Sequence, residues 1–169
     1  MVRAGRKRKE GRRWDNGRVV PEREIGILPE TIARRIELVG KDWDQPQAGY
    51  ALGQLKLRGT LSERQHDAGI RLRQVWLRWA SLAGIPAHEV TQRRGGLTAD
   101  VDTATWEKAR EAFQAAASTV KRCRQSGLVW ATVEGIVMDN YLPPMFVHRG
   151  VAVAALQLGL DELARHFGL

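Results

Sequence analysis

The stretch that decides the fold is TLSERQHDAGIRLRQVWLRWASLAG, residues 60–84. It opens with Ser62 followed three positions later by Gln65, the spacing of a capping box that satisfies backbone N–H groups at the start of a helix, and Thr60 with Glu63 offers a second register. A mostly apolar stripe follows at alternating spacings of three and four, which indicates one face of an α-helix. Gly84 and Pro86 end the pattern. The inward positions of this helix are Gln65, Ala68, Leu72, Val75, Trp79 and Leu82.

A second helix with a matching stripe is predicted from about Asp102 to Cys123. Its inward positions are Trp106, Ala109, Phe113, Ala116, Val120 and Cys123. Two helices of similar length, with matched stripes and a connecting loop, predict an antiparallel pair packed at a shallow angle. The alanines of the second helix allow a close approach, and the tryptophans of the first helix fill the remaining space.

Shorter helices are predicted before this pair. Pro29 and Gly40 suit the first position and the end of one helix, with Ile32, Ile36 and Val39 along one side. Pro46 and Gly59 bound the next, whose stripe is Ala48, Ala51, Leu52 and Leu55.

Two more helices are predicted after the pair. The segment near 127–138 reads as a helix that buries Val129, Val133, Ile136 and Val137, although its β-branched residues make a strand the competing interpretation. The final helix has the inward stripe Val153, Leu156, Leu160, Leu163 and Phe167. On its outer side, Asp161 and Arg165 have the spacing of a charged pair.

The predicted fold is therefore all-α, with five or six helices around a central antiparallel pair. Residues 19–169 are expected to form one helical domain. Its parts are the N-terminal helices (19–59), the long helical hairpin (60–124) and the C-terminal helices (125–169).

Positive charge is concentrated at the start of the chain. Residues 1–18 carry eight cations and two anions, a net +6, whereas the rest of the chain carries only +2 of the total +8. This segment has Trp14 as its one aromatic residue, so it buries too little apolar surface to offset the entropy of ordering. We expect a flexible basic arm that binds the phosphates of a nucleic acid by releasing counterions. A solubilising tail and a targeting address are the alternatives. The cations of the arm are Arg3, Arg6, Lys7, Arg8, Lys9, Arg12, Arg13 and Arg18.

A second set of candidate phosphate ligands lies in the predicted hairpin. Three arginines seven residues apart form a line beside the apolar stripe of the first helix, and two more lie in the flexible RRGG loop, residues 93–96. The opposing flank of the second helix, with Thr105, Ala112 and Thr119, offers no carboxylate to pair with them. The three helix arginines could equally pair with carboxylates elsewhere in the fold, and a solvated helix face, with Asp67 close to Arg71, is the safer interpretation. These arginines are Arg64, Arg71, Arg78, Arg93 and Arg94.

Residues 46–70 offer the parts of a helix-turn-helix, with a short helix, Gly59 in the turn and a capped second helix. However, Gln65 stands where a DNA-reading unit has an apolar contact between its helices, and the second helix is long. A structural helical corner is therefore the favoured interpretation.

Several kinds of chemistry find no support in the sequence. The RRGG loop lacks the Gly-Lys-Ser/Thr ending of a P-loop. The four histidines have no metal-ligand spacing with Cys123, the single cysteine, or with a carboxylate. No apolar run approaches about 20 residues, so no membrane span is expected. We expect a protein that is not an enzyme and needs no cofactor or metal.

Three stretches carry a resemblance to a group of proteins. They are RKRKEGRRWDNGR (6–18), AGYALGQLKLRGTLSERQHDAGIRL (48–72) and ALQLGLDELARHFGL (155–169). With these stretches the chain resembles small helical proteins encoded by phages and prophages of alphaproteobacteria. The resemblance implies a phage-type gene and a cytoplasmic location in a bacterial cell. It is compatible with a small terminase subunit or a transcription regulator.

These observations predict a non-enzymatic nucleic-acid-binding protein, with DNA favoured over RNA. The basic arm would supply most of the affinity, and the helical body would orient the bound nucleic acid. The alternative is an oligomeric structural or adaptor protein, because helical stripes of this spacing also pair between chains.

Overall fold

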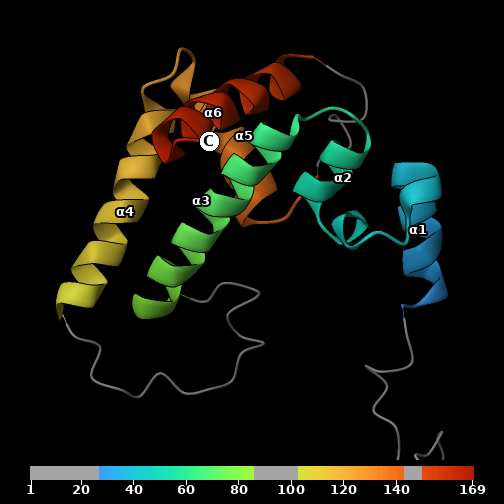
Figure 1. Cartoon of the computed structure of the whole chain (residues 1–169), viewed down its shortest axis with the longest axis horizontal. Helices are drawn as coiled ribbons and strands as arrows, with labels where there is room; N and C mark the ends of the chain where they lie inside the picture. Colours follow the sequence, from blue (N-terminus) through green and yellow to red (C-terminus); the bar gives the residue numbers. More distant parts are fainter. Residues whose placement is uncertain (1–26, 86–102, 143–149) are drawn as a thin grey trace, which may run out of the picture.

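A computed structural model describes residues 27–85, 103–142 and 150–169. Within these residues all regular structure is helical, which confirms the predicted all-α class (Figure 1). The six α-helices of this part are α1 (Pro29–Val39), α2 (Ala51–Leu57), α3 (Glu63–Leu82), α4 (Thr103–Lys121), α5 (Ser126–Val133) and α6 (Val151–Phe167). Three short helices of other types are η2 (Gly40–Asp42), η3 (Pro46–Gly49) and η5 (Glu134–Met138). The prediction of a flexible basic arm falls on residues outside the described ranges.

The central antiparallel pair is confirmed as α3 and α4, which run side by side in opposite directions (Figure 1). Helix α3 begins with the predicted capping box: the Gln65 N–H donates to Ser62 Oγ at 3.2 Å, and the Ser62 N–H donates to Gln65 Oε1 at 3.0 Å. Toward the far end of the pair, Trp79 stacks on Phe113 with the ring centroids 4.8 Å apart.

Helix α6 crosses the end of the pair where α3 begins and α4 ends, and α5 packs beside it (Figure 1). Close packing at this crossing requires glycine, because a Cβ on Gly159 would lie 2.7 Å from Val133 Cγ2 and 2.9 Å from Val129 Cγ1. The core that these helices enclose is apolar, and its largest fully buried side chains are Leu52, Leu55, Leu72, Val120, Val129, Val133, Ile136, Val137, Leu156, Leu160 and Leu163.

Polar bonds across long stretches of sequence fasten the corner between α2 and α3 to the C-terminal third. Asn140 Oδ1 accepts the backbone N–H of Ala51, the first residue of α2, at 2.8 Å. The Gln157 amide donates to the Thr60 carbonyl at 2.7 Å. The Gln65 amide donates to Asp161 Oδ1 at 3.0 Å.

Two contacts predicted from the sequence are wrong: one between Asp161 and Arg165, and one between Gln65 and the second helix of the central pair. Asp161 does not pair with Arg165, because its carboxylate accepts from Gln65 and Arg165 pairs with Glu162 instead. Gln65, expected to lie on the stripe facing the second helix, therefore serves as a polar link to α6. In α1 no residue is buried, and Ile36 on its apolar side remains 48% exposed.

Two predicted helices have different internal geometry. The helix expected over 46–59 is broken at Tyr50, whose extended backbone separates η3 from α2. The helix expected over 127–138 continues from α5 into the π-helical η5. Its wider turn accompanies the burial of the three successive residues 136–138, and the Arg73 guanidinium donates to the Val137 carbonyl there at 3.2 Å.

Candidate functional site

Ten of the thirteen predicted phosphate ligands lie outside the described residues. The ten are Arg3, Arg6, Lys7, Arg8, Lys9, Arg12, Arg13, Arg18, Arg93 and Arg94. The three that the structure places are Arg64, Arg71 and Arg78, and all three are exposed on α3.

These three residues form one surface, which we call the arginine face. Seven residues make nearly two helical turns, so the three side chains leave the same side of α3 at intervals of about 10.5 Å along its axis. Within the described parts of the chain, no carboxylate forms an ion pair with any of the three.

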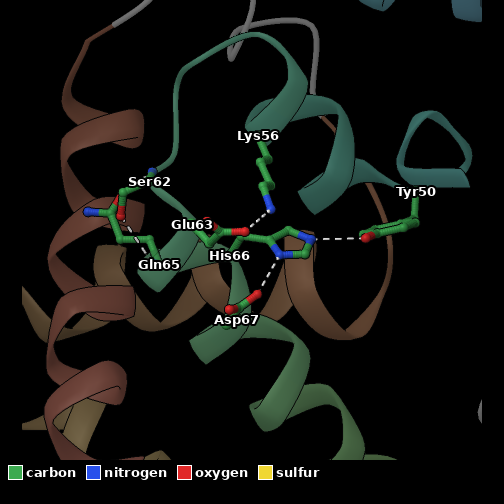
Figure 2. A network of polar contacts seen from close by, with 7 residues as sticks. All are labelled: Tyr50, Lys56, Ser62, Glu63, Gln65, His66 and Asp67. Atoms are coloured by element: carbon green, nitrogen blue, oxygen red, sulfur yellow. Dashed lines mark hydrogen bonds and ion pairs between the residues drawn. The ribbon is translucent and has the colours of Figure 1, made fainter. Parts of the chain in front are cut away.

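The acidic residues of the same exposed side are bound to other partners. Glu63 Oε1 lies 3.1 Å from the ammonium of Lys56, and Asp67 Oδ1 lies 3.0 Å from His66 Nδ1 (Figure 2). The arginine face therefore keeps its charge, although Asp67, which is 54% exposed in its side chain, still places a negative charge between Arg64 and Arg71.

His66 is the centre of a polar network that the sequence did not reveal (Figure 2). It is only 6% exposed, and its two ring nitrogens contact Asp67 Oδ1 and, at 2.9 Å, Tyr50 Oη. Because a carboxylate only accepts hydrogen bonds, Nδ1 carries the proton of the neutral ring and Nε2 accepts from the Tyr50 hydroxyl. The network thus joins the residue before α2 to the first turns of α3.

A carboxylate, an imidazole and a hydroxyl in this order also form the relay that activates a hydroxyl nucleophile. Here burial raises the pKa of the Tyr50 hydroxyl above its ordinary 10.0, and the charges of Lys56 and Arg73 lower it by less. The phenol therefore stays protonated at neutral pH and donates to a buried nitrogen. We interpret Tyr50, His66 and Asp67 as a structural link between helices.

An open groove of about 530 Å³ lies between α1 and the helices it packs on, and Tyr50 forms part of its wall. A smaller hollow of about 300 Å³ adjoins it and shares Arg34, Leu38, Gly49 and Gln54. Arg34 pairs with Glu37 across 3.6 Å in the larger groove. Among the described residues, no three His, Cys, Asp or Glu side chains gather as a metal site would require.

A third charged surface was missed by the sequence reasoning. Lys121, Arg122 and Arg124 are exposed where α4 gives way to α5, and the Lys121 ammonium lies 4.8 Å from the ring centroid of Trp130. We call these four residues the α4–α5 corner. The run KRCR at 121–124 was the available signal, because three of its four residues are cations.

No protein-family model, curated protein or solved structure matches this chain. The described helices include none that is both long enough and apolar enough to cross a bilayer.

Proposed function

We propose that this chain is a non-enzymatic nucleic-acid-binding protein, with DNA favoured over RNA, which attaches to phosphates through its basic N-terminal residues and the arginine face of α3. The observation that carries the proposal is three exposed guanidiniums in line on one helix, without a carboxylate partner in the described part of the chain. Exposed guanidiniums without a carboxylate partner remain available to an external polyanion.

The spacing of the arginine face fits a polyphosphate partner. Its interval of about 10.5 Å corresponds to roughly three base-pair steps along the axis of a duplex. A helix lying along a duplex would therefore present consecutive arginines to phosphates about three base pairs apart. Contacts of this kind fix orientation but do not read bases, so the proposed binding is largely independent of sequence.

The concentration of charge in residues 1–18 supports different roles for this segment and for the arginine face. Eight cations in that segment would contribute up to about −7 to the slope of log affinity against log salt, and the arginine face about −2.7. The phage-type resemblance of the sequence agrees with a DNA-handling role. We propose that the first segment supplies most of the affinity and that α3 orients the body.

The test compares two triple variants that remove the same charge. Arg64, Arg71 and Arg78 are replaced by Gln in one variant, and Lys41, Arg58 and Lys108, which are exposed elsewhere, are replaced by Gln in the control. Duplex DNA binding is measured by fluorescence anisotropy from 0.05 to about 0.3 M salt. We expect the first variant to lose about 2 to 3 from the magnitude of the salt slope, and the control to lose less than about 1. Equal losses in the two variants would refute the arginine face as a binding surface.

The oligomeric alternative is not favoured by a specific contact. The stripes that motivated it pack within the chain, where Leu72 of α3 and Ala116 and Val120 of α4 share one core. Sedimentation of the full chain tests this alternative directly, since a monodisperse monomer would remove it.

A further inference from the structure

The α4–α5 corner places three cations within four residues of chain. Lys121 is the last residue of α4, residues 122–125 make the connection, and α5 begins at Ser126. Lys121, Arg122 and Arg124 are all exposed, and none of them forms an ion pair with a carboxylate of the described residues. This corner therefore concentrates charge as densely as the arginine face.

Trp130 gives the corner an aromatic surface that is held in place. Its ring is half-buried, with the Lys121 ammonium over it and Phe113 of α4 beside it at a centroid distance of 6.5 Å. Phe113 is fixed in turn by stacking on Trp79 of α3.

Helix electrostatics explains only part of this charge. Lys121 and Arg122 lie at the C-terminus of α4, where cations complement the partial negative charge of the helix end. Arg124 lies just before the N-terminus of α5, where a cation is unfavourable, and α5 has no acidic residue in its first turn to compensate. Helix electrostatics therefore does not account for Arg124, which remains available to an external anion.

Resting on the proposed function, we infer that the α4–α5 corner binds single-stranded nucleic acid, with phosphates on Lys121, Arg122 and Arg124 and one base stacked on Trp130. On binding, the Lys121 ammonium leaves the ring for a phosphate and the ring becomes available to a base. Cationic grooves that include stacking aromatics are the usual means of holding single strands, because an unpaired base offers its face and a base within a duplex does not. The corner thus recognises unpaired strands, whereas the arginine face holds phosphates of either form.

The test uses the full chain and two labelled probes, a thymidine 20-mer and a 20-base-pair duplex, in fluorescence anisotropy at constant salt. Trp130→Leu removes the stacking surface, and a triple change of Lys121, Arg122 and Arg124 to Gln removes the charge. Trp43→Leu, at a half-buried tryptophan far along the chain from the corner, is the matched control. We expect Trp130→Leu to weaken thymidine binding about tenfold and duplex binding less than about twofold, as loss of one stacked base requires.

A second measurement does not depend on the stability of a variant. A thymidine 20-mer carrying 5-iodouracil is crosslinked by light to the wild-type chain, and the attached peptide is identified by mass spectrometry. We expect the crosslink on Trp130. The absence of a crosslink on Trp130, or equal weakening of both probes by the corner variants, would overturn the inference while leaving the proposed function intact. If the wild-type chain binds neither probe, the proposed function itself fails.

Discussion

Replacing Tyr50 by Phe removes one hydroxyl from the network around His66 and leaves the ring that packs beside it. The lost hydroxyl is the donor that satisfies His66 Nε2 at 2.9 Å. Because His66 is 6% exposed, little water can reach that nitrogen once the phenol is gone. The substitution therefore isolates the cost of leaving one buried acceptor without a partner.

The magnitude follows from that burial. An ordinary hydrogen bond contributes about 1 kcal/mol, and a buried group left unsatisfied costs about 1–3 kcal/mol. We expect Tyr50→Phe to lower the free energy of unfolding by about 2 kcal/mol. For a chain of this length, that corresponds to a fall of about 4–8 °C in Tm.

The measurement is guanidinium-induced unfolding followed by circular dichroism at pH 8, where the phenol is neutral in both states. Tyr141, the other tyrosine of the chain, provides a matched control. It is 58% exposed, and its hydroxyl makes no hydrogen bond with the described residues, so Tyr141→Phe should change stability by less than about 0.5 kcal/mol.

Alkaline pH offers an independent readout of the same group. Burial raises the pKa of Tyr50 above 10.0 in the folded protein, so the unfolded chain loses this proton first as the pH rises. Wild-type stability should therefore decline above about pH 10, and the Tyr50→Phe variant should lack that part of the decline. If Tyr50→Phe is no more costly than Tyr141→Phe at pH 8, the network does not hold α2 to α3 and our interpretation of it is wrong.

Two further predictions test the charge and the packing described above. Asp67→Asn removes the negative charge within the arginine face. The affinity for duplex DNA at 0.05 M salt, measured by anisotropy titration, should therefore rise by about two- to fivefold. An unchanged affinity would mean that the nucleic acid does not bind at α3. Gly159→Ala puts a methyl group 2.7 Å from a valine side chain of α5, so denaturant unfolding should show a loss of about 1–2 kcal/mol even after the gain in helix propensity. Gly127→Ala, where nothing lies within 4 Å, is its control and should be neutral or stabilising.

The parts of the fold that local patterns specify were predictable. The capping box at Ser62 follows from helix-end chemistry, and the structure confirms it. Periodicity predicted buried positions that the structure confirms in part: Ala68 and Leu72 of α3, Ala109, Ala116 and Val120 of α4, and Val129, Val133, Ile136, Val137, Leu156, Leu160 and Leu163 after them are buried, whereas the remaining members of these stripes are half-buried. The break at Tyr50 was not predictable in this way. A Cβ on Gly53 would lie 2.2 Å from the Gln47 carbonyl, so the chain doubles back there through a contact that no apolar pattern records.

In the candidate site too, relations within one helix could be predicted from the sequence, and relations between helices could not. A spacing of seven predicted that Arg64, Arg71 and Arg78 share one face, which the structure confirms, because that relation lies within a single helix. The network of Tyr50 with His66 and the packing of Lys121 over Trp130 depend on how separate helices meet. Such relations become visible only once the helices are placed in space.

The cap that Asn140 provides for α2 has a consequence for the order in which the chain acquires its shape. Ala51 leaves the ribosome long before its capping partner, 89 residues downstream, has been synthesised. The carboxylate that holds Gln65 and the amide that holds the Thr60 carbonyl arrive later still, 96 and 97 residues downstream. During translation the corner between α2 and α3 therefore lacks its hydrogen bonds to Asp161 and Gln157 until α6 has been synthesised. A premature stop codon before α6 would consequently leave the first half of the chain exposed to proteases, although every residue of that half would be present.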